Sequence, residues 1–98
     1  MVRIMYTWRV SEPQQNTFIQ TWIKTTTQIH KEVKGARGSF MIRSETDPSI
    51  IKTIARWDSA EDWKRFWQNA NPSQMEEMNR LGDRLSAEVF EEIDDFTS

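Results

Sequence analysis

The side chains with the most to offer a ligand are five tryptophans and a single histidine. Trp22, Trp57 and Trp67 could converge on the gap between a sheet and its covering helices, each with an indole N–H that needs an acceptor. A flat apolar slot of that kind would suit a small planar, apolar ligand. The alternative is structural, because large aromatic side chains at this density also fill a core.

His30 is the second candidate for chemistry. It lies at the edge of the apolar stripe of a predicted helix, close to the C-terminal end of that helix. A half-buried histidine bonded to a carbonyl, or an exposed one, is the structural interpretation. The chemical interpretation is a general base, because the ordinary pKa of an imidazole suits proton transfer near neutral pH.

Metal and phosphate chemistry find little support in the sequence. One histidine and no cysteine leave only carboxylates as metal ligands. The acidic pairs at 76–77, 91–92 and 94–95 put neighbours on different sides of a helix or strand, so we expect no metal site. The sequence also lacks a glycine-rich phosphate loop, a nucleotide fingerprint and a nucleophile motif.

Residues 53–72 hold three of the five tryptophans and predict a strand that runs directly into a helix. The strand ends at Trp57, after which Asp58 or Ser59 can cap the helix. Apolar residues then recur at helical spacing: Trp63, Phe66, Trp67 and Ala70. The Asn-Pro pair at 71–72 is expected to end the helix. Core packing is the plain interpretation of this aromatic face, and ligand contact by its tryptophans is the alternative.

Apolar periodicity and turn residues give the remaining elements. We expect strands over residues 2–10, 36–44, 50–57 and 87–96, and helices over residues 11–34 and 73–85. The second and third strands should form a hairpin. Gly38 indicates a bulge or a close backbone approach, and Gly82 a close neighbour inside the last helix. Adjacent apolar residues at 89 and 90 indicate another bulge.

The order β-α-β-β-α-β predicts an α+β domain of the ferredoxin-like type, with a four-stranded antiparallel sheet and helices on one face. The other sheet face would also carry apolar side chains, namely Met5, Met41 or Ile42, Ile51 or Ile54, and Phe90. Pairing of two copies through this open sheet face would cover these side chains, so we predict a homodimer.

Length and composition set the remaining limits. With 98 residues, of which 37% are hydrophobic and 29% charged, we expect a single globular domain over residues 1–98. The net charge of −2 argues against non-specific nucleic-acid binding. We expect no membrane association and a cytoplasmic location, because no apolar segment reaches the length of a membrane span. The acidic residues from Glu76 onward form a solvated edge or, in a dimer, meet the more basic front of a second copy.

Two segments resemble the antibiotic biosynthesis monooxygenase family of dimeric α/β barrels. They are GARGS at 35–39 and IARWDSAEDW at 54–63. The preceding helix, with FIQTW at 18–22, is similar to that of uncharacterised relatives in the same group. In order and spacing the resemblance covers nearly the whole chain. It implies a barrel formed by two sheets across a dimer, with a pocket between each sheet and its own helices.

The branches of this family with known chemistry make different demands. The haem-degrading branch needs an iron-ligating histidine on the segment at 75–85, which contains none here. The branch that oxidises aromatic polyketides without a cofactor uses an Asn on the third strand, a Trp four residues later and an Arg on the second-helix segment. Trp57 matches the Trp, and Arg80 could serve as the Arg. Thr53 stands at the Asn position, where it can donate one hydrogen bond but cannot hold a carbonyl as an amide does.

The resemblance therefore implies a cofactor-independent monooxygenase, an oxidoreductase acting on a planar aromatic or quinol-type small molecule. Trp57 would contact the substrate, Arg80 would stabilise an oxyanion and His30 would take a proton. The expected substrate-binding residues are Trp22, Thr53, Trp63 and Trp67. The alternative is a non-catalytic dimer with a binding or structural role. In an enzyme the three catalytic candidates should meet at one cavity, whereas in a structural dimer they should be scattered and the gap filled.

Overall fold

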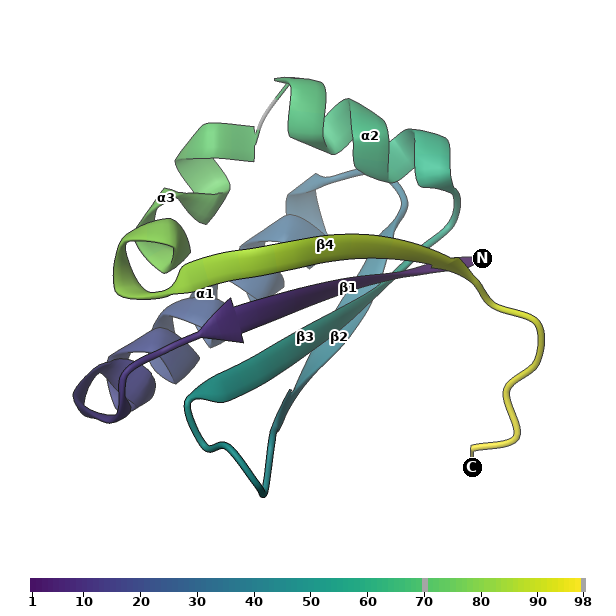
Figure 1. The fold of residues 1–98 in the computed structure, drawn as a ribbon. Coiled ribbons are helices and arrows are strands. Elements are labelled where there is room, and N and C mark those ends of the chain that lie inside the picture. The colour runs from purple at the N-terminus through teal and green to yellow at the C-terminus, as the bar shows by residue number, and fades with distance from the viewer. Residues whose placement is uncertain (70, 98) are drawn as a thin grey trace.

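The computed structural model describes residues 1–69 and 71–97. The strands are β1 (Val2–Arg9), β2 (Ala36–Arg43), β3 (Ile50–Trp57) and β4 (Asp83–Glu91). The helices are the short 3₁₀ helix η1 (Glu12–Gln14) and the α-helices α1 (Gln15–Glu32), α2 (Ala60–Asn69) and α3 (Asn71–Leu81). Figure 1 shows the strands side by side in one sheet, with the helices packed against it and a tail leaving the end of β4.

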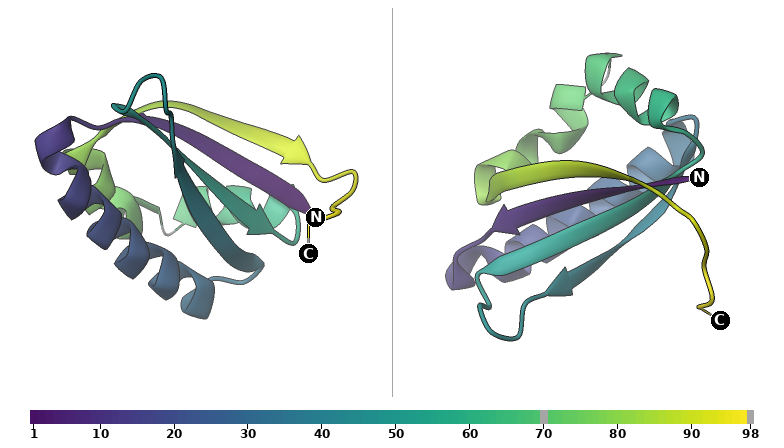
Figure 2. Two further views of the ribbon diagram at one scale, coloured as in Figure 1. Left: turned by 90° about the horizontal axis from the view of Figure 1, so that it is seen from below. Right: turned by 45° about the vertical axis from the view of Figure 1, so that its right-hand side comes forward.

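The described residues form a four-stranded sheet in the order β2-β3-β1-β4, in which every neighbouring pair is antiparallel. The helices lie on one face of this sheet and leave the other face open (Figure 2). The predicted ferredoxin-like α+β plan is therefore confirmed. Strand β1 pairs along its length with both β3 and β4, so it runs through the interior of the sheet.

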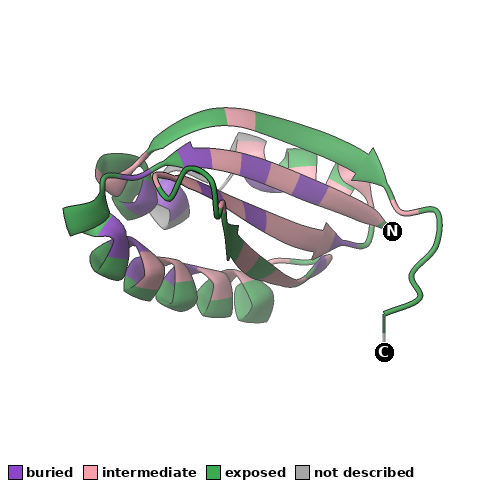
Figure 3. Ribbon diagram, turned by 60° about the horizontal axis from the view of Figure 1, so that its bottom comes forward, coloured by how far each residue is buried: buried purple, intermediate pink, exposed green. Residues whose placement is uncertain are grey.

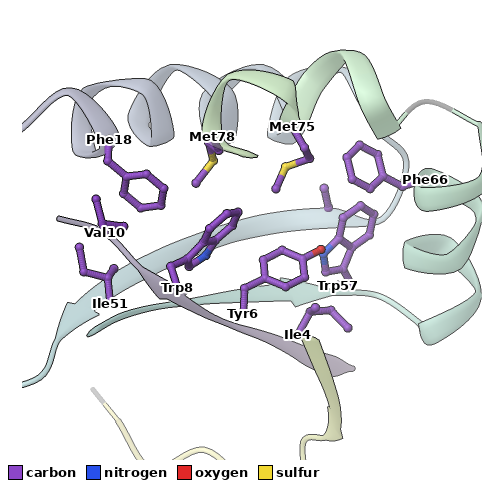
Figure 4. Close-up of a cluster of buried hydrophobic side chains, with 11 residues drawn as sticks. Ile4, Tyr6, Trp8, Val10, Phe18, Ile51, Trp57, Phe66, Met75 and Met78 are labelled. Carbon is purple, nitrogen blue, oxygen red and sulfur yellow. The ribbon is translucent and has the colours of Figure 1, made fainter. Parts of the chain in front are cut away.

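Alternation along β1 decides which side chains enter the core. Buried positions alternate with partly exposed ones along this strand (Figure 3), and the buried residues are Ile4, Tyr6, Trp8 and, just after the strand, Val10. Helix α1 contributes Phe18, whose ring packs edge-on against Trp8 with 5.2 Å between ring centroids. The other elements complete the cluster in Figure 4 with Ala36, Ile51, Trp57, Phe66, Met75 and Met78.

Helix α1 begins later than residue 11, where the predicted helix starts. The Ser11 side chain makes no capping hydrogen bond, and the turn η1 precedes the start of α1 at Gln15. The buried side-chain amide of Gln15 donates to the carbonyls of Val10 (3.1 Å) and Pro48 (2.6 Å). These bonds tie the start of α1 to the end of β1 and to the hairpin turn. The threonines at 25–27 do not interrupt the helix.

Three local predictions around β3 are confirmed. Strands β2 and β3 form the hairpin, and their register shifts between Ala36 and Gly38. Gly38 has a φ of 117°, a value that favours glycine, and a Cβ there would meet no atom within 4 Å, so this glycine marks a bulge and not a close approach. Ser59 caps α2, because its side-chain oxygen accepts a hydrogen bond from the backbone N–H of Asp62 at 3.1 Å.

The last helix and strand differ from the prediction at both ends. Helix α3 begins at Asn71 and ends at Leu81, so the Asn-Pro pair starts a helix as well as following one. Strand β4 begins at Asp83 and ends at Glu91. The register of β4 against β1 shifts opposite Thr7 and Trp8, and not at positions 89 and 90, where a bulge was predicted. Residue 70, predicted on the aromatic face of α2, lies outside the described residues.

Gly82 follows the last residue of α3 at a point where the backbone passes close to the core. A Cβ at this position would lie 2.8 Å from Cγ2 of Val10 and 3.3 Å from Cε1 of Phe18. The predicted close neighbour of Gly82 is therefore present, but Gly82 itself belongs to the turn between α3 and β4 and not to the helix. Only a residue without a side chain lets the backbone pass this close to the core.

The open face of the sheet mixes apolar and charged side chains. Its apolar residues are Met5, Phe40, Ile42, Ile54 and Phe90. Of the residues considered for this face, Met41 and Ile51 lie on the helix side, and Ile51 is buried in the core. Among the exposed ones, about half of the surface of Phe40 and Ile42 is accessible in the single chain.

A charged cluster holds the end of β4 to this open face. The Glu92 carboxylate accepts hydrogen bonds from Arg3 Nε at 2.7 Å and from Arg56 Nη2 at 2.9 Å. Arg3 also reaches Asp95 at 3.3 Å. Hydrogen bonding from Arg3, and then from Arg56, holds the pKa of Glu92 below its ordinary value, so this carboxylate stays charged at neutral pH.

We predict that Gly82→Ala destabilises the protein by about 1–3 kcal/mol, because the added methyl group overlaps the buried Val10 side chain. Urea unfolding followed by circular dichroism measures this change. Val10→Ala removes the overlapping methyl group, so the double variant should lose less stability than the two single variants together. Wild-type stability of Gly82→Ala would contradict this explanation of the turn.

Candidate functional site

A cavity lies between the helix-covered face of the sheet and the helices. Its volume is about 50 Å³, room for about two water molecules. The lining is largely apolar and is drawn from β1, β2, β3 and every α-helix. Its lining includes Tyr6, Trp22, His30, Thr53, Trp57 and Met75.

Four of the predicted site residues meet at this cavity. Trp22 and His30 reach it from α1, where they lie about two turns apart on one face of the helix. Thr53 and Trp57 reach it from β3, where a spacing of four residues puts both side chains on one sheet face. Thr53 and Trp57 are buried, each with 4% of its surface exposed, whereas His30 is exposed on its other side. The sheet side of the cavity is therefore shielded from solvent, and the ionisable His30 lies where the cavity meets solvent.

The other three predicted site residues are not among those that line the cavity. Arg80 lies exposed on α3, where its guanidinium is 3.7 Å from the Glu76 carboxylate one turn earlier. Trp63 and Trp67 lie on α2 and pack edge-on against each other with 6.2 Å between ring centroids. Of the three catalytic candidates, His30 and Trp57 therefore meet at the cavity, whereas Arg80 does not line it.

Thr53 already has a structural partner in the core. Its hydroxyl oxygen accepts a hydrogen bond from the indole N–H of Trp8 at 3.2 Å, and both side chains are buried. The hydroxyl keeps its own proton, which it can still donate. Thr53 therefore supports the core through its oxygen and can serve the cavity through its proton.

Tyr6 also lines the cavity, although it was not among the predicted site residues. Only 8% of its surface is exposed, and its hydroxyl oxygen accepts a hydrogen bond from the indole N–H of Trp63 at 2.9 Å. The guanidinium of Arg84 on β4 lies 4.3 Å from the ring centroid of Trp67 and 5.5 Å from that of Tyr6. Alternation along β1 does indicate that Tyr6 faces inward, but no local pattern links it to partners so far along the chain.

A second, larger hollow adjoins the cavity at the edge of the sheet. It has a volume of about 420 Å³ and lies between α1 and β2. Trp22 and Ser39 line both spaces, so these two side chains separate the inner cavity from the outer groove. Trp22 is only partly buried, and its indole is the largest of the groups between them.

The charges around the cavity are few. Arg56 is among its lining residues, but its guanidinium bonds to Glu92 at the open face of the sheet. Across residues 1–69 and 71–97, no three histidine or acidic side chains come close enough together to ligate a metal ion. The helices described here also include none that is long and apolar enough to cross a membrane. An apolar molecule with one or two polar atoms suits such a lining.

Comparisons with known proteins agree with the fold. The family model described as "Antibiotic biosynthesis monooxygenase" matches residues 1–77. A Bordetella bronchiseptica structure has a TM-score of 0.82 at 12% identity and covers 94% of this chain and 96% of that one. SnoaB, a cofactor-independent oxygenase from Streptomyces nogalater, has a TM-score of 0.79 at 12% identity over 99% and 97%. A conserved protein from Bacteroides thetaiotaomicron has a TM-score of 0.76 at 21% identity over 93% and 96%. The search of curated proteins returned no match.

We predict that Thr53→Val destabilises the protein by about 1–3 kcal/mol, because the isosteric change leaves the buried Trp8 N–H without its acceptor. Thr53→Ser keeps the hydroxyl and should lose less stability. Chemical unfolding of the three proteins measures the difference. If Thr53→Val proves as stable as the wild type, the hydrogen bond between β1 and β3 does not support the floor of the cavity.

Proposed function

The chain belongs to the antibiotic biosynthesis monooxygenase family, and on that premise we propose that it oxidises a planar, electron-rich aromatic or quinol-type molecule with O₂, without a bound cofactor. The observation that carries the proposal is the meeting of His30 and Trp57 at one apolar cavity. The similarity of the fold to SnoaB, a cofactor-independent oxygenase, supports the reaction class.

A reaction of this kind can be balanced with O₂ as the sole oxidant. In a substrate such as an anthrone, the ring CH₂ group loses one proton to a base and becomes an electron-rich carbanion. The carbanion forms a C–O bond with O₂, and protonation gives a hydroperoxide. Loss of the second C–H proton with cleavage of the O–O bond releases water and leaves a C=O group. The carbon gives up four electrons and O₂ accepts four, so no external reductant is needed.

The cavity residues can be assigned to these steps. His30 at the solvent edge takes the first proton, since an imidazole is suited to proton transfer near neutral pH and can pass the proton to water. Trp57 presents its buried indole to the flat face of the substrate, with Phe66 packed behind it at a centroid distance of 5.6 Å. The Thr53 hydroxyl can donate a hydrogen bond to a substrate oxygen.

The cavity must enlarge to admit such a substrate, because small-molecule sites in proteins usually measure roughly 300–1,000 Å³. Two features of the lining allow this. Met75 and Met78 have flexible side chains that can repack around a ligand. Rotation of the partly buried Trp22 would join the cavity to the outer groove of about 420 Å³, which brings the combined space into the usual range.

The same proposal includes a homodimer formed through the open sheet face. In the single chain Phe40, Ile42 and Phe90 each expose between 44% and 48% of their surface on this side. The tail after β4 adds Ile93 and Phe96, both 93% exposed. Apolar side chains gathered in this way are usually covered by a partner, and a second copy would present the same residues about a twofold axis.

We predict that the wild type sediments as a dimer and that Ile42→Glu shifts it toward the monomer, because the carboxylate would be buried against the partner sheet. Analytical ultracentrifugation at several concentrations measures the equilibrium. Glu45→Gln, in the exposed turn that follows β2, is the matched control. A wild type that sediments as a monomer at every concentration would remove this part of the proposal.

The second candidate function is a non-catalytic dimer of the same fold with a binding or structural role. Two observations favour it. The cavity is mostly filled at about 50 Å³, and Arg80, the family-based candidate for oxyanion stabilisation, lies outside the cavity lining. The two candidates differ in whether the substrate is consumed.

We predict that the protein accelerates the oxidation of 1,8-dihydroxyanthrone to the corresponding anthraquinone, with one O₂ consumed per product. His30→Gln should lower kcat about a hundredfold, because a general base typically contributes at least that factor. An oxygen electrode together with quinone absorbance measures the rate over the spontaneous reaction. Lys24→Gln, exposed on the same helix, should match the wild type. Saturable binding without any acceleration would favour the non-catalytic candidate.

A further inference from the structure

We propose that the Tyr6 hydroxyl donates a hydrogen bond to the substrate oxygen on which negative charge develops. The inference rests on the proposed function, because it concerns the same cavity and the same class of substrate. Tyr6, on β1, would take the oxyanion-stabilising role that the family resemblance implied for Arg80. Tyr6 lines the cavity, whereas Arg80 lies exposed on α3.

The ring of Tyr6 is held in one orientation by its neighbours. Trp8 and Trp67 pack against it edge-to-face, with centroid distances of 6.1 Å and interplanar angles of 83° and 80°. Figure 4 shows the ring extending from β1 into the space below Met75, with its oxygen directed toward the end of the cluster that holds Trp57. A donor held in this way loses little freedom when it meets a ligand.

The hydrogen bonding of the hydroxyl leaves its proton available. The oxygen accepts the N–H of Trp63 at 2.9 Å. Within the part of the chain that the structure describes, no hydrogen bond has the Tyr6 hydroxyl as its donor. A phenol that accepts a hydrogen bond becomes a stronger donor, because the bonds in a chain polarise one another. The geometry thus places a polarised O–H group at a cavity whose described lining residues include no carboxylate.

The electrostatic surroundings keep Tyr6 protonated while favouring charge on a bound oxygen. Burial raises the pKa of the Tyr6 hydroxyl, and the hydrogen bond from Trp63 and the charge of Arg84 oppose this shift. The phenol is therefore neutral and able to donate at physiological pH. The guanidinium of Arg84, 5.5 Å from the Tyr6 ring, would also attract an oxyanion placed beyond the hydroxyl.

Tyr6 is the strongest hydroxyl donor among the cavity residues. The other hydroxyls of the lining belong to Thr25, Thr26, Ser39 and Thr53. These aliphatic alcohols are weaker acids than a phenol and so donate weaker hydrogen bonds to an oxyanion.

The test measures the ionisation of a bound probe and does not depend on oxygenation. 4-Nitrophenol is a planar phenol whose ionised form absorbs at visible wavelengths, so a pH titration gives its apparent pKa when bound. We expect wild-type protein to lower this pKa relative to free 4-nitrophenol. Tyr6→Phe should reduce the ratio of bound phenolate to bound phenol about tenfold, as expected for the loss of one hydrogen bond to a charged group. Affinity for 4-nitrotoluene, which cannot ionise, should change less than about twofold.

Trp63→Phe provides a second variant that keeps the Tyr6 hydroxyl and removes the N–H that polarises it. It should reduce the phenolate ratio by a smaller factor, about threefold. Circular dichroism confirms that each variant is folded, and the Trp63 variant serves alone if Tyr6→Phe does not fold. An unchanged phenolate ratio in the folded variant would overturn the inference, as would a wild-type protein that fails to bind the probe.

The outcomes separate this inference from the proposed function. If the anthrone is oxidised but the phenolate ratio is the same in Tyr6→Phe, the inference about Tyr6 fails and the monooxygenase proposal stands. If the ratio falls as expected but the anthrone is not oxidised, Tyr6 is an oxyanion-binding residue in a protein that does not catalyse this oxidation.

Discussion

The structure depends on hydrogen bonds that satisfy the polar atoms of aromatic side chains buried between the sheet and the helices. Strand β1 is paired on both edges and packs one face against helices, so Tyr6 and Trp8 enter the core with a hydroxyl and an indole N–H. Thr53 accepts from Trp8, and Tyr6 accepts from Trp63. These two bonds join β1 to β3 and to α2, and they hold Thr53 and Tyr6 in place in the lining of the cavity. The residues that position the site are therefore also those that stabilise the fold.

This constraint shapes what the site can do. Because the core groups supply one another with hydrogen bonds, the cavity is left with few free polar atoms and little volume, about 50 Å³. The aromatic walls suit an apolar planar molecule of the kind proposed above, and its admission would require neighbours such as Met75 and Trp22 to repack. Chemistry that draws its electrons from the substrate is suited to this lining, since the protein needs to supply only a base and a hydrogen-bond donor.

Much of the fold could be predicted because periodicity and capping report local structure. The spacing of Thr53 and Trp57 on β3 correctly put both side chains on the covered face of the sheet. The end of α3 was misjudged because a glycine inside an apolar repeat looks tolerable, whereas contact of Gly82 with Val10 is a tertiary fact. Trp63 lies outside the cavity lining, a placement that the sequence does not indicate, because a helical repeat shows which side of α2 is buried but not which part of the sheet it covers.

The most direct measurement is ¹⁹F NMR of protein labelled with 5-fluorotryptophan, titrated with anthraquinone-2-sulfonate, a planar molecule that is not consumed. Single Trp→Phe variants assign the resonances of the five tryptophans. We predict that the resonances of Trp22 and Trp57 shift together and saturably, with one dissociation constant, because both indoles line the cavity. A ligand site in this cavity would be contradicted if neither resonance moved at saturating ligand, or if only the α2 tryptophans Trp63 and Trp67 responded.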